Sequence, residues 1–399
     1  MTDLVLYDDA RARRFEPFAL VRPACELRAG VLLVRERWEH ALGQPGVAHV
    51  SAEHLRAFDE PGAPRAATGP LPAGTVLANA RCAVALAPAA DADAWYCDGR
   101  VAAVRLAAPV SLDDLAHGER ALDALVRPGG RAATIGGRWM DEVWHFIRDL
   151  PAQLGEDIAA LAAGATPLPA SHGGRAGTQG VFVERDAVVE PMVFFDVTAG
   201  PVLVREGATV QAFTRLVGPC VVGRYSLAGT DRIAASSIGD WCRVHGELST
   251  SILLGHSNKG HDGFVGHSYL GRWVNLGAGT ITSNLKNTYG PVALWTPDGM
   301  RDTGLQFLGA LIGDHAKTGI GVRLTTGSVI GAGANVFGGD VMPKVVPPFA
   351  WGDGPPFGTH ALPKFLETAE RMMQRRGVPL SAGARAQLSA AHAARGPAV

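Results

Sequence analysis

The sequence lacks several features that mark common classes of protein. It has only 5 cysteines in 399 residues, an odd number without a C-x-x-C pair, which argues against a disulfide framework or a zinc knuckle. It has no run of about 18 apolar residues and no apolar stretch behind a basic N-terminal region, so neither a transmembrane helix nor a signal peptide is expected. These absences together predict a protein of the reducing cytoplasm.

The sequence also lacks an excess of charge of either sign. Lys and Arg (37) nearly equal Asp and Glu (38), so neither nucleic acid nor an anionic membrane is expected as a partner. Gly (50) and Pro (26) are abundant, while charged residues make up only 19% of the chain. This composition is typical of a compact, turn-rich protein, and the length suggests more than one domain.

The first 150 residues have the pattern of an α/β domain. Short apolar runs such as Leu4–Tyr7 alternate with polar stretches that suit helices. A helix is predicted over 138–163, and Pro151 must kink or restart it. The segment that follows is rich in Gly, Pro and Ser, so 151–180 is assigned to the end of this helix and a linker.

From Val181 onward, a period of six replaces this pattern. Aliphatic or bulky residues recur every six positions, glycine often follows them directly, and small residues often stand four places later. The recurring residues are Val183, Val189, Phe195, Val204, Val210, Leu216, Val222, Ile238, Val244, Phe264, Leu270, Leu276, Ile312, Leu324, Ile330 and Val336. Period six fits neither an amphipathic helix nor an alternating strand. It fits a short strand and a tight turn, three of which close one triangular coil, so on the order of seven coils are expected; the alternative is an irregular, Gly-rich β-domain.

The repeat is interrupted once and then ends. Between Thr280 and Leu308 the sequence is polar and rich in turn residues, and a long loop leaving a rigid solenoid is often functional. Residues 342–399 are predicted to form a helical tail, with one amphipathic helix stopped by Gly377 and a second over 381–394. We expect this tail to cap the open end of the solenoid or to cover a neighbouring subunit.

The densest group of chemically useful side chains precedes the interruption. The segment Asn275-Leu-Gly-Ala-Gly-Thr-Ile-Thr-Ser-Asn284 carries two asparagines, and His261 stands fourteen residues before the first of them. In residues and spacing, this stretch resembles the acetyltransferase domain of the bifunctional N-acetylglucosamine-1-phosphate uridyltransferase/glucosamine-1-phosphate acetyltransferase family. The resemblance implies that the solenoid is a left-handed parallel β-helix.

The resemblance also implies a role for each matching residue. His261 would be the general base that takes a proton from a sugar amine as the amine attacks the thioester of acetyl-CoA, a task that suits a neutral imidazole. Asn275 and Asn284 would hold the sugar or orient the site. Phe264 falls on an aromatic sugar contact that is normally Tyr, and Ala278 falls where the backbone lies against acetyl-CoA.

Other positions either keep the family pattern or depart from it. Glu247, fourteen residues before His261, matches the pattern. The phosphate-gripping Lys of the family falls on Ser249, and the Tyr after the second Asn is Leu285. The side chains that would replace the missing positive charge are Arg232, Arg243, Lys259 and Lys286.

The remaining histidines and two tryptophans are interpreted as structural. His245, His256 and His315 are expected to be surface hydrogen-bonding residues, and His267 is expected to belong to the repeat itself. Trp241 and Trp273 are expected to cover the solenoid.

The N-terminal half resembles sugar-1-phosphate nucleotidyltransferases through the run from Arg14 to Arg22-Pro. The Gly-rich loop that normally precedes this run is replaced by residues 8–14, the family Lys by Ala24, and a metal-binding Asp by Asn79. Arg11, Arg13, Arg14 and Arg22 would bind a phosphorylated ligand such as UTP, and nucleotidyl transfer would need Mg²⁺. The alternative is a domain that has lost catalysis and serves binding or assembly.

The combined prediction is a CoA-dependent N-acetyltransferase acting on a glucosamine-1-phosphate-like amino-sugar phosphate, with nucleotidyltransferase activity in the N-terminal domain, in nucleotide-sugar biosynthesis. The expected domains are an α/β domain over 1–150, the linker over 151–180, the β-helix over 181–341 and the tail over 342–399. Acetyl-CoA is the expected cosubstrate, and no metal is expected in the solenoid. Because relatives are trimers with sites between subunits, a homotrimer is expected. The alternatives are a zinc hydratase of the γ-carbonic-anhydrase type, with three histidines across an interface, and a non-catalytic sugar-nucleotide-binding scaffold.

Overall fold

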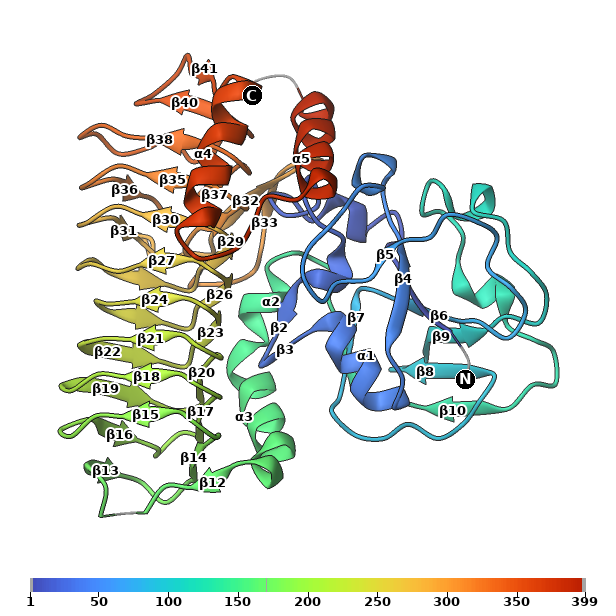
Figure 1. Ribbon diagram of the computed structural model, residues 1–399, viewed down its shortest axis with the longest axis horizontal. Helices are drawn as coiled ribbons and strands as arrows, with labels where there is room; N and C mark the ends of the chain where they lie inside the picture. Colours follow the sequence, from blue (N-terminus) through green and yellow to red (C-terminus); the bar gives the residue numbers. More distant parts are fainter. Residues whose placement is uncertain (1–2, 170, 397–399) are drawn as a thin grey trace. The chain divides into compact units, whose positions relative to one another are not determined.

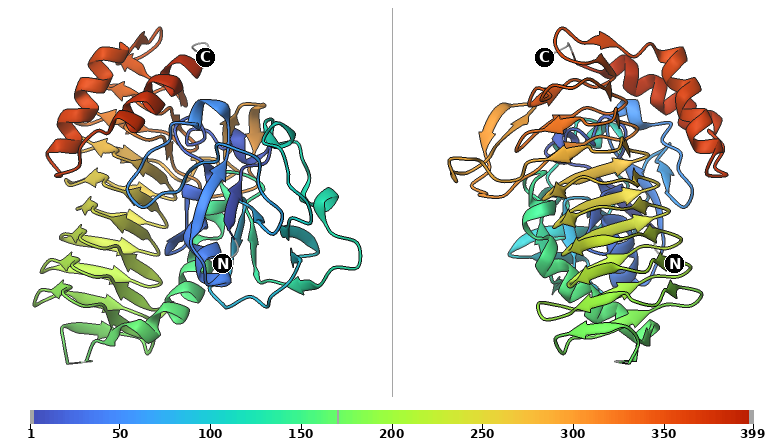
Figure 2. Two further views of the ribbon diagram at one scale, coloured as in Figure 1. Left: turned by 45° about the vertical axis from the view of Figure 1, so that its right-hand side comes forward. Right: turned by 90° about the vertical axis from the view of Figure 1, so that its left-hand side faces the viewer.

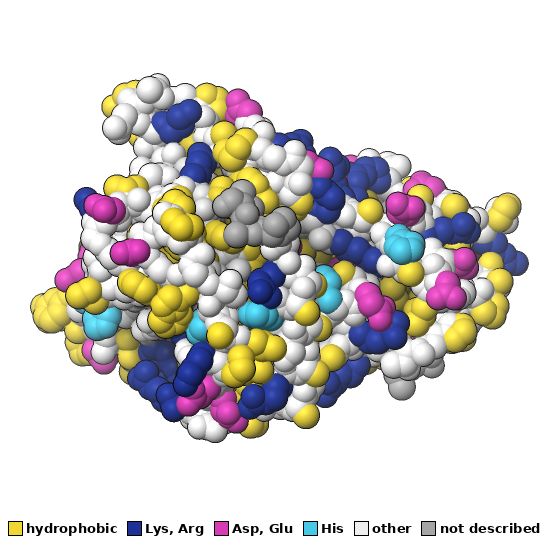
Figure 3. All heavy atoms as spheres, turned by 90° about the horizontal axis from the view of Figure 1, so that it is seen from above, with side chains coloured by type: hydrophobic (Ala, Val, Ile, Leu, Met, Phe, Trp, Pro, Cys, Tyr) yellow, Lys and Arg dark blue, Asp and Glu magenta, His cyan; other side chains and the backbone are white. Residues whose placement is uncertain are grey.

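The computed structural model describes residues 3–169 and 171–396, so a single position of the expected linker and both chain ends lie outside it. The chain divides into two compact units (Figure 1). One comprises the residues up to Val143 together with Leu366–Arg395, and the other comprises Trp144–Phe365. In the described part of the chain, no helix has the length and apolar character needed to cross a membrane. Acidic and basic side chains are intermixed over the face seen in Figure 3, as their near-equal numbers predict.

The N-terminal unit is built on a seven-stranded sheet in the order β10-β8-β9-β6-β1-β4-β5. The central strand β1 pairs in parallel with β4 and β6, and β9 runs antiparallel to β6. All four side chains of β1 are buried, as expected of a strand covered on both faces. The strands are β1 (Leu4–Tyr7), β4 (Gly46–Val50), β5 (Arg65–Ala66), β6 (Val76–Asn79), β8 (Ala94–Cys97), β9 (Arg100–Arg105) and β10 (Ala132–Thr134). This mixed sheet confirms the predicted α/β class.

Smaller elements complete this unit. Helix α1 (Val34–Leu42) packs on β7, and two short antiparallel pairs stand beside the main sheet: β2 (Arg28–Ala29) with β3 (Leu32–Leu33), and β7 (Cys82–Val84) with β11 (Gly137–Trp139). Residues 137–139 therefore form a strand, which corrects the helix predicted over 138–163. The helical part consists of α2 (His145–Arg148) and α3 (Leu150–Leu161). Pro151 lies in the first turn of α3, where its missing N–H leaves no hydrogen bond unmade.

The C-terminal tail is divided between the units, whereas it was expected to cap the open end of the solenoid or to cover a neighbouring subunit. Phe365, near the start of α4 (Leu362–Gln374), packs edge-on against Phe349 of the last coil at 5.0 Å. Helix α5 (Ala382–Ala394) instead packs in the N-terminal unit, where Gln387 donates a hydrogen bond to the Val21 carbonyl at 2.9 Å. The N-terminal unit is thus completed by the last helix of the chain.

The second unit is the predicted parallel β-helix, whose coils stack as successive rungs (Figure 2). Its three flat sheets are called faces one, two and three. Face one contains β12 (Thr166–Pro167), β14 (Val181–Val183), β17 (Val202–Val204), β20 (Cys220–Val222), β23 (Ser237–Asp240), β26 (Ile252–Gly255), β29 (Tyr269–Arg272), β34 (Leu311–Ile312), β37 (Val329–Ile330) and β39 (Val345–Val346). Helix α3 packs against face one at β20.

Faces two and three close each coil. Face two contains β15 (Val188–Val189), β18 (Thr209–Val210), β21 (Leu227–Ala228), β24 (Arg243–Val244), β27 (Asn258–Lys259), β30 (Asn275–Leu276), β35 (Lys317–Thr318), β38 (Asn335–Val336), β40 (Ala350–Gly352) and β41 (Gly358–Thr359). Face three contains β13 (Gly174–Ala176), β16 (Phe194–Asp196), β19 (Thr214–Val217), β22 (Asp231–Ala234), β25 (Leu248–Ser249) and β28 (Val265–Gly266), and is continued by β31 (Ile281–Thr282) with β36 (Arg323–Leu324). The interruption of the repeat holds a hairpin of β32 (Ala293–Thr296) and β33 (Gly299–Asp302).

The period-six residues form the core of this unit, with one informative exception. Most of them, from Phe195 to Val336, are buried in a single apolar cluster. Phe264 is the exception, because the inward position belongs to its neighbour Val265. Strand side chains alternate between the two faces of a sheet, so Phe264 points outward.

The coils are shorter than the sequence suggested, and more of them fit into the chain. Successive face-one partners are 18 residues apart at Val202 and Cys220, but only 15 apart at Ser237 and Ile252. The shorter coils shift the frame of the six-residue repeat before Ile238. Nine of the ten strands of face one pair in parallel, since β12 is antiparallel to β14, where about seven coils were expected.

An aromatic column runs along one corner of the solenoid. Tyr225 stacks on Trp241 with ring centroids 4.6 Å apart, and His256 lies 4.1 Å from Trp273. These residues and His315 all adopt positive φ angles of 53–63°, so five successive coils turn the same corner with an aromatic side chain. The column confirms that the two tryptophans cover the solenoid. It corrects the interpretation of His315, which is buried beside Trp273 and Phe365 and not at the surface.

Candidate functional site

A column of small residues crosses face three where several predicted site residues lie. Ala234, Ser249 and Gly266 are successive partners in the parallel ladder. The residues before them, Ile233, Leu248 and Val265, are fully buried. Because side chains alternate along a strand, the small column and a second column stand outward. The second column consists of Arg232, Glu247 and Phe264.

Phe264 and Asn284 meet over Gly266. A Cβ atom added to Gly266 would lie 2.4 Å from Cζ of Phe264 and 2.7 Å from Nδ2 of Asn284, so only glycine fits beneath them. Asn284 Nδ2 donates a hydrogen bond to Nδ1 of His267 at 2.8 Å. The structure therefore brings two predicted substrate contacts together, at the edge of a floor made of small side chains.

His267 belongs to this group, although the sequence suggested only a structural role. Its ring stacks on Phe307 with centroids 5.3 Å apart, and Phe307 comes from the end of the interruption in the repeat. Burial lowers the pKa of His267 to about 4, so the imidazole is neutral near pH 7 and its Nδ1 accepts from Asn284. The proton then lies on Nε2. The signal available in the sequence was that His267 directly follows Gly266 within the repeat.

We expect His267 to make the protein less stable as the pH falls from about 6.5 to about 4. Across this interval the unfolded chain binds a proton at His267 that the folded chain does not, so the free energy of unfolding decreases with pH. Relative to His267→Gln, which keeps an acceptor for Asn284, the native protein should lose about 2 kcal/mol between pH 7 and pH 4. Thermal melting of both proteins across this range measures the difference. A difference that does not change with pH would contradict a buried, neutral His267.

His261 lies on the turn between β27 and β28 and is exposed. Within the described residues its imidazole makes no hydrogen bond. Its carbonyl oxygen instead accepts from Nζ of Lys259, which also donates to the His245 carbonyl at 2.8 Å. Lys259 is only 2% exposed, and burial lowers its pKa to about 8. Lys259 therefore fastens the turn that presents His261 and is not placed to contact a substrate.

Of the four candidate cations, Arg232 is the one that stands on face three with its head exposed. It forms a long ion pair of 3.4 Å with Glu247, and both side chains are 44% exposed. Arg243 donates to the backbone carbonyls of Tyr225 and Cys242 from face two. Lys286 donates to the Pro291 carbonyl at 2.9 Å, inside the interruption of the repeat.

The two remaining predicted residues lie at a different face. Asn275 is part of β30 on face two, where its Oδ1 accepts from Asn258 Nδ2 at 2.9 Å. Ala278 follows β30, and its carbonyl accepts from the Gly321 amide at 2.7 Å. A single chain thus presents the predicted residues on two faces, with His261 on the turn between them.

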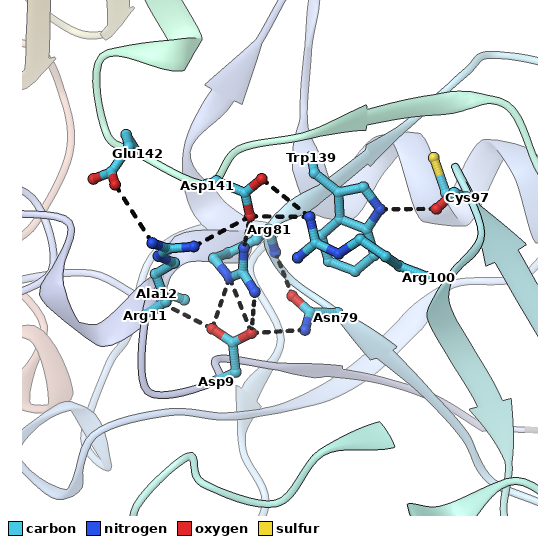
Figure 4. Close-up of polar contacts among 10 residues, drawn as sticks. All are labelled: Asp9, Arg11, Ala12, Asn79, Arg81, Cys97, Arg100, Trp139, Asp141 and Glu142. Atoms are coloured by element: carbon cyan, nitrogen blue, oxygen red, sulfur yellow. Dashed lines mark hydrogen bonds and ion pairs between the residues drawn. The ribbon is translucent and has the colours of Figure 1, made fainter. Parts of the chain in front are cut away.

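The N-terminal unit has a cavity of about 500 Å³ next to the carboxyl ends of β1 and β6. In parallel sheets this edge is where ligands bind. Figure 4 shows an ion-pair network beside it, centred on Arg81, which contacts Asp9 and Asp141 at 2.6 Å each. Arg100 lies flat on the Trp139 ring at 3.8 Å and contacts Asp141 at 3.0 Å. Asn79, the expected metal position, donates to Asp9 at 2.9 Å.

Of the four arginines predicted to bind a phosphorylated ligand, Arg13, Arg14 and Arg22 do not line this cavity, whereas Arg11 does. Arg22 is buried in an ion pair with Glu60 at 2.8 Å, beneath the Phe58 ring. Arg14 is exposed on a short helical turn after β1. The cavity is lined by Arg11 together with Arg81, Arg100 and Arg120. These come from separate parts of the chain, so no local sequence motif marks them.

Comparisons with known proteins found similarity to one family model and to several bifunctional proteins. Residues 4–166 match the sugar nucleotidyl transferase family. The bifunctional protein GlmU of Bartonella quintana is 30% identical over 173 residues, which cover 41% of this chain and 33% of that protein. A bifunctional sugar-1-phosphate nucleotidylyltransferase/acetyltransferase of Sulfurisphaera tokodaii is 35% identical over 100 residues, 25% of each chain. Over these segments the chain is similar to GlmU and to related bifunctional proteins. The matched segments span a third or less of these relatives.

One solved structure shows a weaker likeness to this chain. It is a point mutant of AntD, an N-acyltransferase from Bacillus cereus, in complex with dTDP-4-amino-4,6-dideoxyglucose and coenzyme A. It is 12% identical, covers 50% of this chain and 91% of its own, and has a TM-score of 0.22. At that score the likeness adds nothing to the assignment. As for metals, the described residues of this one chain contain no group of three or more His, Cys, Asp or Glu side chains arranged to hold an ion.

Proposed function

We propose that the solenoid is a CoA-dependent N-acetyltransferase that acts on an amino-sugar phosphate resembling glucosamine 1-phosphate. The observation that carries the proposal is the meeting of Phe264 and Asn284 over Gly266, beside the small column of face three. An aromatic ring and a fixed amide next to a floor without side chains suit a sugar ring. The sequence similarity to a protein named as a bifunctional sugar-1-phosphate nucleotidylyltransferase/acetyltransferase supports the same function.

The proposed reaction joins the acceptor nitrogen to the acetyl carbon. The amine attacks the thioester carbonyl, a C–N bond forms, the C–S bond breaks, and CoA leaves as a thiolate that takes up a proton from solvent to become the thiol. His261 takes the proton that the amine loses, which is general-base catalysis. Its exposed imidazole makes no hydrogen bond within the described residues, so it is available to the amine.

Asn275 and Ala278 enter this proposal through a second copy of the chain. They lie on face two, whereas Phe264 and Asn284 lie on or beside face three. We propose a homotrimer in which face two of one copy meets face three of the next. Acetyl-CoA would then lie along Ala278 of one copy, while the sugar contacts Phe264 and Asn284 of another.

The test is a panel of amino-sugar phosphates incubated with acetyl-CoA, with free thiol as the readout. We expect thiol release to depend on an amino-sugar phosphate and acetylated sugar to form in equal amount. Absence of acceptor-dependent release across the panel would contradict the proposal. Nucleotidyl transfer would need Mg²⁺, but both carboxylate oxygens of Asp9 in the N-terminal unit already accept hydrogen bonds.

Arg232 is proposed to bind the phosphate of the acceptor. Replacing it with alanine should raise KM for the amino-sugar phosphate by about 10-fold and leave kcat nearly unchanged, because the lost contact is made equally in the ground and transition states. The KM of the unphosphorylated amino sugar should not change. Arg185→Ala removes a comparable exposed arginine, paired with Glu206 at 2.5 Å, and serves as the control. Equal KM values for Arg232→Ala and the native enzyme would assign the phosphate to another residue.

A further inference from the structure

The oxygens at the ends of β1 and β6 do not fit a divalent cation. Mg²⁺ prefers carboxylate and water oxygens that are free to face it. Asp9 Oδ1 already accepts from the Ala12 amide at 2.9 Å and from Nε of Arg81 at 2.8 Å. Its Oδ2 accepts from Asn79 Nδ2 at 2.9 Å and from Nη2 of Arg81 at 2.6 Å. Both oxygens are therefore satisfied by donors, one of them a cation.

Neither neighbour of Asp9 provides a replacement. Asp8 is buried, and both of its oxygens lie 3.1–3.2 Å from the Ala24 amide, which donates to them. Asn79 Oδ1 accepts from the Arg81 amide at 2.8 Å. Arg81 thus places its positive charge where a metal would have to bind, which disfavours a second cation there.

The same cavity is well supplied with guanidinium groups that face solvent. The Arg100 and Arg11 side chains line it and are 42% and 50% exposed. Arg100 is held flat by the Trp139 ring, and Trp139 Nε1 donates to the Cys97 carbonyl at 3.0 Å, which fixes the ring (Figure 4). A planar guanidinium held in one orientation matches the oxygens of a phosphate.

The contacts of the Asp141 carboxylate indicate which arginines can bind an anion in this cavity. Its carboxylate is contacted by Arg81 at 2.6 Å, by Arg100 at 3.0 Å and by Arg11 at 3.6 Å. Arg81 is the closest of the three and also forms an ion pair with Asp9. Asp141 therefore keeps Arg81 as a partner if the other two arginines bind a ligand. Arg11 has a further partner in Glu142 at 3.5 Å. Arg100 and Arg11 are consequently available to an incoming anion, as is Arg120, which lines the cavity and is also exposed.

From this arrangement we infer that the N-terminal cavity binds a phosphorylated ligand through Arg100 and Arg11, without a divalent metal. Guanidinium groups take the place that Mg²⁺ holds in metal-dependent phosphate sites. The unit is accordingly a binding domain and not a site of nucleotidyl transfer. The volume of about 500 Å³ is within the range of small-ligand pockets.

The experiment is titration calorimetry of UDP into the full chain, in EDTA and again in MgCl₂. We expect binding in EDTA and a dissociation constant that changes less than about 3-fold with Mg²⁺. Inorganic pyrophosphate should compete with UDP, since the phosphates are the part recognised. Arg100→Ala and Arg11→Ala should each weaken UDP binding by about 10-fold.

Arg131→Ala is the control, because Arg131 is an exposed arginine of the same unit that pairs with Asp91 at 2.8 Å and does not line the cavity. It should bind UDP like the native protein. UDP binding that needs Mg²⁺, that pyrophosphate does not compete with, or that Arg100→Ala leaves unchanged would each overturn the inference, as would no binding at all. Thermal melting of each variant confirms that it is folded. Failure of acetyl transfer would not affect this outcome, because the readout is binding in the N-terminal unit.

Discussion

Replacing His261 with alanine is expected to reduce kcat for acetyl transfer by about 100- to 10,000-fold, the range typical of losing a general base. The imidazole is the proposed proton acceptor, it is exposed, and it makes no internal hydrogen bond in the described residues. Its loss should therefore leave the fold unchanged. Thiol release from acetyl-CoA, measured at saturating acceptor, gives the change in kcat.

The matched control for this variant is His172→Ala. His172 is also exposed and belongs to the same unit, where its ring contacts the Val189 carbonyl at 3.2 Å. It should retain native kcat, and both variants should keep the native melting temperature. Native turnover by His261→Ala on every acceptor of the panel would remove His261 from the mechanism.

The largest effect on stability is expected from Phe195→Ala, which should lower the free energy of unfolding by about 3–5 kcal/mol. Phe195 is fully buried in the core of the solenoid, and β16 pairs with strands on both sides. Truncating its ring leaves a cavity that the rigid coil cannot close. Chemical denaturation followed by circular dichroism measures the loss.

Phe213→Ala provides the comparison, because this phenylalanine lies one coil further on and is 65% exposed at a corner. Its replacement should change the free energy of unfolding by less than about 0.5 kcal/mol. Similar losses for the two variants would show that the apolar repeat does not form the core in the way described.

The β-helix was predictable because a short-range sequence pattern, the six-residue repeat, specifies it. A residue such as Leu216 or Val222 repeats every six positions, since each short strand must send one side chain inward, and the structure buries both. The number of coils was not predictable, because coils of 15 and 18 residues leave the same kind of pattern with a shifted frame. Because of that shift, the sequence pattern predicted Phe264 in the core, whereas the structure buries Val265 there.

The site was only partly predictable. Asn284 and Phe264 were found through the resemblance, and the structure brings them together. Phe307 was missed because it returns to His267 only after the hairpin of the interruption is formed. Of the arginines that line the N-terminal cavity, Arg11 was predicted to bind a phosphorylated ligand, whereas Arg81, Arg100 and Arg120 were missed for a similar reason. The ion-pair network of the cavity joins Asp9, Arg81 and Asp141. Its ion-paired residues are 60 or more positions apart along the chain, so no short sequence motif contains them.

The position of α5 has a consequence for how the protein is made. This helix comes last in the chain, yet Gln387 and Ser381 hydrogen-bond to Val21 and Asp59 of the first unit. On the ribosome, the N-terminal residues emerge long before the helix that completes their unit. The β-helix between them can fold coil by coil while the first unit still exposes the surface that α5 will cover. A chain that loses α5 should therefore fail in the part that was synthesised first.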